Sequence, residues 1–305
     1  MTPHAAITGA AIAAACILGT AGAALAKCEN IPSGLDAPPP PQNTGRDIVG
    51  QELDQILDQG FITFGVYEAY PPFSFLEDGA PAGIDIELGR VIAEEMGLEP
   101  RFEMVAASES VDSDLRTYLW QNSKLGAPIV NVLLHVPYNA DFACRNEMVV
   151  ITGQYFEERI AIAYDPAVYP DKAPTPVYFR YDKVAVENDS IADFFLSGSF
   201  GGQVLPNIVR LSDPVAAVNA IGQDGVAAAM GPRVQIEYAA GDRFPVSAEA
   251  IPGFALGSWT LGVAVHQAYR DLGYMVDDAI GTAIADGRIE AIFAEYGATF
   301  TAPQR

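Results

Sequence analysis

Short apolar runs of strand length alternate with amphipathic segments of helix length along most of this chain. The strand-like runs cover 61–66, 129–134, 160–164, 183–187, 208–211, 226–230 and 259–265. Between two of them, Ile84, Leu88 and Ile92 recur at helical spacing, and Gly97 stands where that helix would end. This alternation predicts an α/β fold with mostly parallel sheets.

Ligands of α/β proteins bind beyond the carboxyl ends of the strands, near the N-termini of helices. In this chain the stretches that follow predicted strands are 67–73, 135–139, 188–190 and 231–233. Asn188-Asp189-Ser190 resembles a helix cap, and Asp213-Pro214 has the residue types that open a helix. We therefore expect the ligand-binding residues to lie in these four stretches.

The N-terminus has the pattern of an export signal. Residues 1–26 contain no Lys, Arg, Asp or Glu and end in Ala24-Leu25-Ala26, a small-residue cleavage pattern. A Pro-rich leader follows over 27–46, with four prolines from Pro38 to Pro41. These features predict a signal peptide, secretion to the periplasm and no membrane insertion.

Cleavage after residue 26 would remove Cys16 and leave Cys28 and Cys144. An oxidising compartment makes a disulfide between them plausible. The alternative is a pair of unbonded, buried thiols.

The charge balance excludes some partners. The chain has 17 Lys and Arg against 39 Asp and Glu, a net charge of −22. Such a surface repels phosphate backbones, so we expect no nucleic-acid partner. With 3 histidines and no calcium-loop spacing among the acidic clusters, the sequence predicts neither a metal site nor a cofactor. Motifs of the common hydrolases and nucleotide-binding enzymes are also absent.

Two side chains in the middle of the chain are candidates for ligand contacts. The guanidinium of Arg145 could clamp a ligand carboxylate, or form a surface ion pair with Asp141 or Glu147. His135 stands at the end of a predicted strand, where a functional residue is as plausible as a structural one. Asp85 opens a helix, and we expect it to serve the helix dipole.

Both ends of the chain resemble one protein family. The segments are F-G-V-Y-E-A-Y-P-P-F-S-F over 64–75, G-I-D-I-E-L over 83–88 and A-D-G-R-I-E-A-I-F-A-E-Y-G over 285–297. Together they resemble family 3 extracellular solute-binding proteins, the amino-acid-type receptors of ABC importers. The resemblance covers about 47–300, and its middle part is loose.

This resemblance implies a two-lobed type II periplasmic binding protein. Lobe 1 would comprise 47–155 plus 255–305, and lobe 2 would comprise 156–254, with closure by a hinge motion. In the family an Arg before the first crossover strand binds the ligand carboxylate, and Arg145 resembles it. Tyr70 resembles the aromatic that stacks on the ligand, and 188–190 lie where a helix N-terminus holds the carboxylate.

Two departures weaken an amino-acid specificity. The family's acid for the α-amino group is missing from 226–233, where Met230, Pro232 and Arg233 stand. The segment 126–139 resembles instead the divergent branch associated with quinoprotein alcohol dehydrogenases.

Three functions follow from these observations. The first is a monomeric, non-enzymatic receptor that passes a small carboxylate-bearing or polar metabolite to an ABC importer permease. The second is an accessory protein of a periplasmic quinoprotein (methanol or alcohol) dehydrogenase. The third is an enzyme resembling cyclohexadienyl dehydratase, with Glu68 as its acid. The expected ligand-binding residues are Tyr67, Glu68, Tyr70, Phe73, His135, Tyr138, Asn139, Arg145, Asn188, Ser190, Met230 and Arg233.

Overall fold

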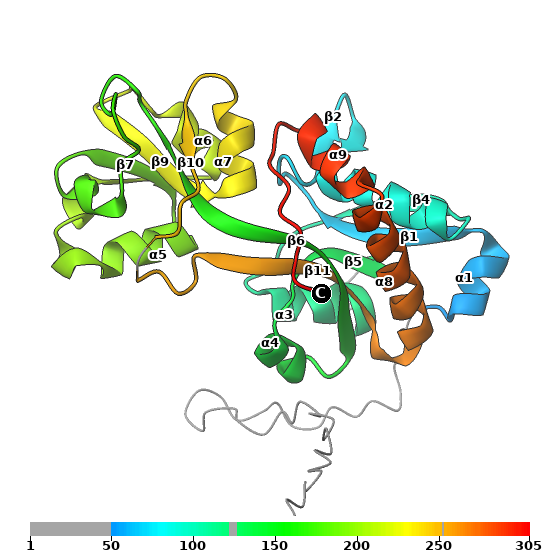
Figure 1. Ribbon diagram of the computed structural model, residues 1–305. Helices are drawn as coiled ribbons and strands as arrows, with labels where there is room; N and C mark the ends of the chain where they lie inside the picture. The colour runs from blue at the N-terminus through cyan, green and yellow to red at the C-terminus, as the bar shows by residue number, and fades with distance from the viewer. Residues whose placement is uncertain (1–49, 122–126, 252) are drawn as a thin grey trace, which may run out of the picture. The chain divides into compact units, whose positions relative to one another are not determined.

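The computed structural model describes residues 50–121, 127–251 and 253–305 (Figure 1). Its strands are β1 (Phe61–Tyr67), β2 (Phe75–Glu77), β3 (Ala80–Ala82), β4 (Glu99–Val105), β5 (Val132–Pro137), β6 (Val149–Tyr164), β7 (Lys183–Glu187), β8 (Ile208–Leu211), β9 (Val226–Pro232), β10 (Val246–Ser247) and β11 (Ser258–His266). Its α-helices are α1 (Leu53–Gln59), α2 (Ile84–Glu95), α3 (Val111–Leu115), α4 (Ala140–Arg145), α5 (Ile191–Gly198), α6 (Pro214–Asn219), α7 (Arg233–Ala240), α8 (Arg270–Ala285) and α9 (Arg288–Glu295).

The strands form a mixed sheet in the order β4-β1-β5-β11-β6-β9-β7-β8, and β10 also pairs with β6. The pairs of β1 with β4 and β5, and of β7 with β8 and β9, are parallel. The pairs β5–β11, β11–β6 and β6–β9 are antiparallel. The predicted α/β class is confirmed, and the parallel pairs are those of the outer strands.

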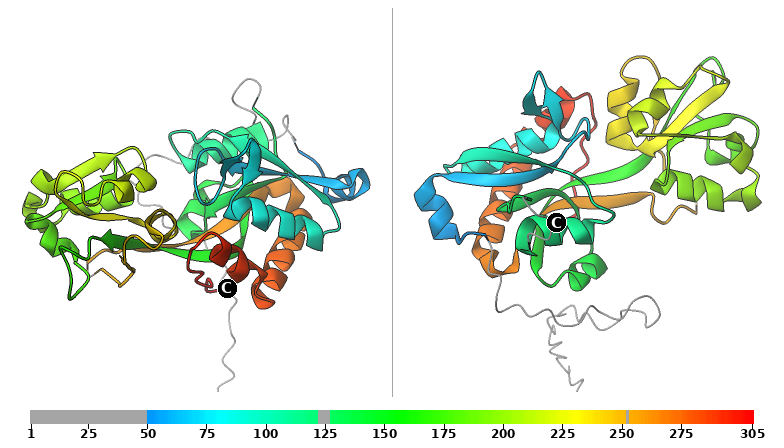
Figure 2. Two further views of the ribbon diagram at one scale, coloured as in Figure 1. Left: turned by 90° about the horizontal axis from the view of Figure 1, so that it is seen from above. Right: turned by 180° about the vertical axis from the view of Figure 1, so that it is seen from behind.

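Two long strands connect the halves of this sheet (Figures 1 and 2). β6 is 16 residues long. It pairs with β11 from Val149 to Arg159 and with β9 from Ile160 to Tyr164. We call β4, β1 and β5 the first strand group, and β9, β7 and β8 the second strand group.

The predicted lobe boundaries lie close to these connections. The division after residue 155 falls inside β6, and the division after residue 254 falls just before β11. All described residues belong to one compact unit. The division into lobes at these residues therefore stays a prediction.

Helices cover both faces of the first strand group. Because side chains alternate along a strand, Val132 and Leu134 of β5 enter one core, and Leu133 enters another. The first core includes buried residues of α2, α8 and α9, such as Ile92. The second core is closed by α3, α4 and the π-helical turn Arg116–Gln121.

The second strand group is covered in the same way. Leu196 of α5 packs with Val186 of β7 in one core. Val218 of α6 and Ile236 of α7 pack in the core on the other side, with Ala185 of β7. This layering places the N-termini of α5 and α6 directly after the carboxyl ends of β7 and β8.

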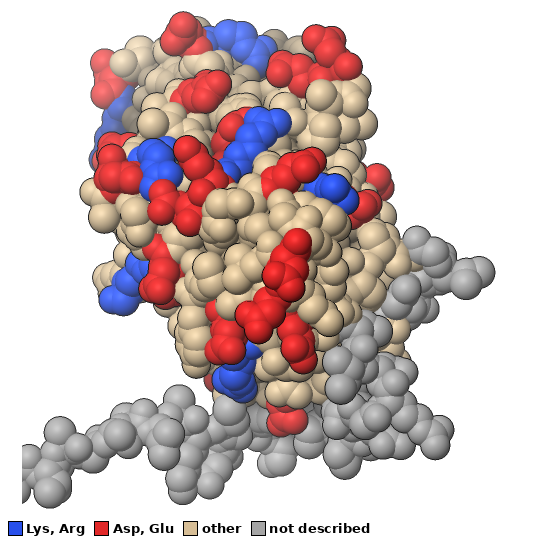
Figure 3. Space-filling model, turned by 90° about the vertical axis from the view of Figure 1, so that its right-hand side faces the viewer, with Lys and Arg blue, Asp and Glu red and all other residues tan. Residues whose placement is uncertain are grey.

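The acidic surface expected from the composition is visible on the face shown in Figure 3, where Asp and Glu side chains lie interspersed with Lys and Arg. Among the described residues, no helix has the length and apolarity needed to cross a membrane. The predicted signal peptide (1–26), the leader (27–46) and Cys28 lie outside the described residues.

Candidate functional site

His135 lies at a β-bulge in β5. The pairing with β11 shifts between Gly262 and Ala264, so that Leu134 and His135 face a single residue of β11. His135 has a positive φ of 60°, which is uncommon for a residue with a Cβ. Bulges bend their strand and redirect side chains, and they are frequent next to functional sites.

A second irregularity positions Tyr155 in β6. Three residues of β6, 153–155, face the single residue Gly262 of β11. A Cβ on Gly262 would lie 2.6 Å from the carbonyl oxygen of Thr152. Glycine is therefore required where the two strands approach each other, and Tyr155 is fully buried beside them.

Asp85 joins these two side chains. Its Oδ2 lies 3.2 Å from Nδ1 of His135, and the hydroxyl of Tyr155 donates to its Oδ1 at 3.0 Å. Asp85 is fully buried at the start of α2. Burial and the adjacent carboxylate of Asp85 raise the pKa of Tyr155 well above its ordinary value. Tyr155 therefore remains a neutral donor.

The contact with Asp85 orients the imidazole of His135. In the neutral ring, a carboxylate beside Nδ1 favours the tautomer that carries its proton on that nitrogen. Among the described residues no hydrogen bond engages Nε2, and the side chain is 12% exposed. His135 can therefore accept a hydrogen bond from a bound molecule, or exchange a proton with it.

Two aromatic rings flank His135. Its ring lies 4.3 Å from that of Phe73 and 5.1 Å from that of Tyr70, both in edge geometry. Phe73 is buried, whereas Tyr70 is partly exposed. Burial and the charges of Glu158, Glu187 and Asp85 raise the pKa of Tyr70. The structure thus brings together three of the predicted residues: Tyr70, Phe73 and His135.

Tyr67 is held in a neighbouring network. Its hydroxyl donates to Asp114 at 3.0 Å, and the backbone N–H of Ser108 donates to the same carboxylate at 2.8 Å. Burial and Asp114 raise the pKa of Tyr67. Glu68, the next residue in the chain, is exposed, and its backbone N–H donates to the carbonyl oxygen of Val105.

The predicted residues after β5 have mainly local contacts. Tyr138 is 40% exposed, and Asn139 caps α4 by accepting from the N–H of Phe142. Arg145 ends α4 with its side chain 55% exposed. Its Nε lies 3.9 Å from Asp112, and its guanidinium lies 5.7 Å from the ring centroid of Phe142. No contact of Arg145 with Tyr70 or His135 exists in the described part of the chain.

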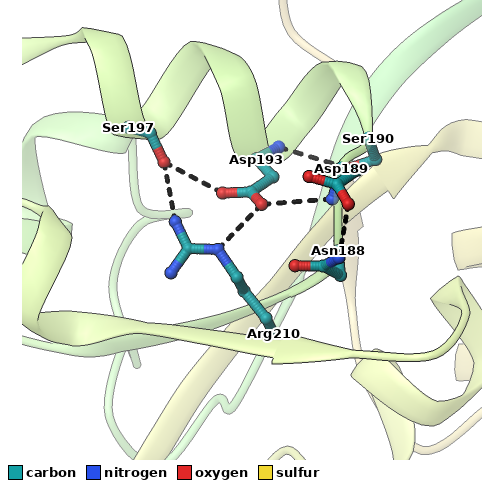
Figure 4. Close-up of polar contacts among 6 residues, drawn as sticks. All are labelled: Asn188, Asp189, Ser190, Asp193, Ser197 and Arg210. Carbon is teal, nitrogen blue, oxygen red and sulfur yellow. Dashed lines mark hydrogen bonds and ion pairs between the residues drawn. The ribbon is translucent and has the colours of Figure 1, made fainter.

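The N-terminus of α5 is capped by the chain itself (Figure 4). Ser190 accepts from the N–H of Asp193, as the predicted N-cap should. The carboxylate of Asp193 accepts from the N–H of Asp189 and from Arg210 Nε at 2.8 Å. Asn188 is exposed and donates to the side chain of Asp189.

Met230 and Arg233 are buried near the end of β9. Met230 is 1% exposed and packs in the core beneath α5. Arg233 is 6% exposed and donates to the carbonyl oxygen of Thr299 at 2.6 Å and to the hydroxyl of Thr301 at 2.8 Å. Met230 is therefore a core residue, and the guanidinium of Arg233 is held by the C-terminal segment, with its Nε 3.8 Å from Glu237.

Sequence reasoning missed another buried carboxyl, Glu158. It is 1% exposed, and its Oε2 has no hydrogen-bond partner among the described residues. Burial raises its pKa to about 8, although the hydrogen bond from the N–H of Arg159 and the charge of Arg233 lower it. The charged run 157–159 inside a strand was the sequence signal that could have indicated a buried acid.

The described residues contain no group of three or more His, Cys, Asp or Glu placed to hold a metal ion. Cys144 lies on α4, but Cys28 lies outside the described ranges. The predicted disulfide therefore stays a prediction.

Comparison with known proteins identifies the family resemblance independently. Residues 62–116 match the model of bacterial extracellular solute-binding proteins, family 3. No curated protein matches the chain.

Solved structures share the fold at low identity. An ancestral cationic amino acid solute-binding protein is 19% identical, with a TM-score of 0.64, over 80% of this chain and 98% of its own. The L-cystine solute receptor of Neisseria gonorrhoeae is 16% identical, with a TM-score of 0.58, over 84% and 100%. An amino acid ABC transporter substrate-binding protein from Streptococcus pneumoniae, bound to L-arginine, is 18% identical, with a TM-score of 0.58, over 83% and 100%.

Proposed function

We propose that this chain, whose residues 62–116 match family 3 of the bacterial extracellular solute-binding proteins, is a periplasmic receptor for a small solute. Its solved structural neighbours include receptors for amino acids and cystine. The proposed partner is the membrane permease of an ABC importer, because the Streptococcus pneumoniae neighbour is the substrate-binding protein of an amino acid ABC transporter.

The observation that carries this proposal is the cluster of Tyr70, Phe73 and His135, which we call the His135 cluster. Tyr70 follows the carboxyl end of β1, and His135 lies at the bulge in the second half of β5, close to the strand ends where α/β proteins bind their ligands. Asp85 fixes the imidazole while leaving Nε2 without a partner among the described residues. Preorganised polar groups beside aromatic rings are typical of small-molecule sites.

The connecting strands support the same function. β6 and β11 join the two strand groups, so a bend in both would move one group relative to the other. Hinge closure around a ligand is the usual response of binding proteins built in this way. We propose that solute bound at the His135 cluster is also contacted from the second strand group near the carboxyl end of β7.

Isothermal titration calorimetry tests the proposal with a panel of amino acids, small carboxylates and amines. We expect one chemical class to bind, and we expect His135→Ala and Tyr70→Ala to weaken that binding by about tenfold or more. Tyr274→Ala serves as the control, because Tyr274 is 63% exposed on α8. Absence of binding by every class, with unchanged circular dichroism, would overturn the proposal.

A catalytic role is the second candidate, because one observation favours it. The Asp85–His135 pair has the orientation of a general base held by a carboxylate. One structural neighbour is described as an ancestral amino acid-binding protein and a precursor of cyclohexadienyl dehydratase, at 19% identity and a TM-score of 0.54. Turnover of a cyclohexadienyl substrate that is lost in His135→Ala would support it. Binding of such a substrate without turnover would contradict it.

The association with a quinoprotein dehydrogenase stays a prediction that rests on sequence resemblance. Size-exclusion chromatography with a purified dehydrogenase would detect a complex, and would also show whether the chain alone is a monomer.

A further inference from the structure

We propose that the chain has a second binding site, in a cavity between α7, β2 and α9, and that this site takes a quaternary ammonium compound. The cavity has a volume of about 460 Å³ and is lined by Phe75, Glu77, Tyr238, Glu295 and Tyr296. Cavities that hold small molecules typically measure about 300–1,000 Å³. We call it the Tyr238 cavity. It shares no lining residue with the His135 cluster, so the proposal does not depend on what that cluster binds.

Two of the rings that line the Tyr238 cavity are held in place by the chain. Phe75 begins β2, and Tyr296 follows the last residue of α9. Their ring centroids lie 6.4 Å apart with an angle of 89° between the ring planes, in edge geometry. The hydroxyl of Tyr296 accepts from the backbone N–H of Gly83 at 2.9 Å, which anchors this ring against the start of α2. The two rings therefore need little ordering when a ligand binds.

The third ring, that of Tyr238, comes from α7, which packs on the second strand group. Tyr238 is 37% exposed. The Nε2 of Gln235 donates to the carbonyl oxygen of Pro71 at 3.2 Å, in the stretch before β2. The carboxylate of Glu237 accepts from the N–H and the hydroxyl of Thr299 at 2.7 and 3.0 Å, just after α9. These hydrogen bonds hold α7 next to the two segments that carry the other rings.

The two acids of the cavity have no counter-ion. Glu77 and Glu295 are both exposed, and neither makes a side-chain hydrogen bond or an ion pair within the described residues. No Lys, Arg or His is among the described residues that line the cavity. A cation would therefore be attracted by both carboxylates without displacing a partner from the chain, whereas an anion would meet two like charges.

Three rings beside two carboxylates favour a quaternary ammonium group over other cations. The faces of Tyr and Phe rings attract a cation, and aromatic sites for quaternary ammonium ligands such as choline are built in this way. A primary ammonium carries three N–H donors that need acceptors. A metal ion would need several oxygen ligands close together, and the described residues contain no group of three or more His, Cys, Asp or Glu placed to hold one.

Isothermal titration calorimetry with choline tests the proposal. The matched compound is the uncharged tert-butyl analogue of choline, in which carbon replaces the nitrogen, and we expect choline to bind about tenfold more tightly than this analogue. We expect Tyr238→Leu and Glu295→Gln each to weaken choline binding by about fivefold or more, because they remove one ring and one carboxylate from the cavity. The controls Tyr274→Leu and Glu103→Gln make the same changes at exposed positions on α8 and β4, and should leave the affinity unchanged.

The outcomes separate this proposal from the receptor function. Choline affinity that falls in His135→Ala but not in Tyr238→Leu would place the cation at the His135 cluster and overturn the proposal. Equal binding of choline and its tert-butyl analogue, or no binding of choline to the folded protein, would overturn it as well and leave the receptor function standing. Choline binding that requires Tyr238, with no binding by any class in the panel of amino acids, small carboxylates and amines, would support it and overturn the receptor function alone.

Discussion

At the scale of single residues, the proposed site depends on the carboxylate of Asp85. It accepts from the hydroxyl of Tyr155 and contacts Nδ1 of His135, and it is fully buried. A helix N-terminus tolerates such a charge because the first N–H groups of the helix lack intrahelical partners. The local sequence therefore explains why an acid stands at the start of α2, but not what it binds.

Replacing Asp85 with Asn should change the tautomer of His135. The amide group can donate to Nδ1, and the proton of the neutral ring would then move to Nε2. Nitrogen chemical shifts of the imidazole report this change directly. Asp114→Asn is the control, because Asp114 is also buried but accepts from Tyr67. An unchanged tautomer in Asp85→Asn would show that the pair does not orient His135.

Glu158 should make stability depend on pH. Its pKa rises from 4.5 to about 8 on burial, so the folded state binds more protons than the unfolded state between these values. The free energy of unfolding therefore falls, through this group, as pH rises from about 5 to about 8. We expect Glu158→Gln to remove this fall, so that the Tm difference between variant and wild type grows with pH. A difference independent of pH would contradict the raised pKa.

At the scale of elements, the start of α2 is fixed by one glycine. Gly83 is the N-cap with a φ of 124°, and a Cβ there would lie 2.3 Å from the carbonyl oxygen of Phe73. That carbonyl accepts from the N–H of Asp85 at 2.8 Å, so the same contact positions the carboxylate.

Gly83→Ala should therefore destabilise the protein by about 3 kcal/mol or more, because it combines backbone strain with a steric clash. Gly79→Ala is the matched control: its φ of 83° is also positive, but nothing lies within 4 Å of its Cβ position. We expect a cost of about 1 kcal/mol there. Equal losses in urea unfolding would show that the clash with Phe73 is not what positions α2.

Much of the element order could be predicted from the sequence. The strands at 183–187 and 208–211, the end of α2 just before Gly97 and the caps Ser190 and Asp213 are confirmed, because local turn and capping chemistry determines them. β4 was missed because its alternate positions Glu99 and Glu103 are charged and exposed on an edge strand. The strand predicted at 160–164 is only the end of β6, because the charged run 157–159 interrupts the apolar pattern.

The site could be predicted only in part, for a physical reason. Strand ends pointed to Tyr70, Phe73 and His135, which the structure brings together. The partners Asp85 and Tyr155 lie 50 and 20 residues from His135 in sequence, and two bulges place them in contact. Strand register and bulges depend on tertiary pairing, so no local sequence pattern predicts them.

At the scale of the whole molecule, the C-terminal segment 299–305 forms hydrogen bonds with α7 and with β6, which are distant from it in sequence (Figure 1). Thr299 and Thr301 accept from Arg233 of α7, and the N–H of Thr299 donates to Glu237 of the same helix. The carbonyl oxygen of Thr301 accepts from the N–H of Glu157 in β6. This C-terminal segment therefore connects the second strand group with the strand that leads into it.

Replacing Arg233 with Met should loosen this connection. We expect a loss of about 3 kcal/mol in stability, because the buried partners lose a charged donor. We also expect faster hydrogen exchange at the Glu157 and Thr299 amides. Arg243→Met, which removes an exposed Arg bound to Asn219, is the control. Unchanged exchange at both amides would show that the segment does not restrain β6.

The central proposal is that the His135 cluster holds a small solute. The most direct measurement is a high-resolution crystal structure of the protein, purified without unfolding and then soaked with the best binder from calorimetry. We expect electron density for a small molecule against the ring of Tyr70 and within hydrogen-bond distance of His135 Nε2. Density for that molecule only elsewhere on the protein, with ordered water against Tyr70 and His135, would contradict the proposal.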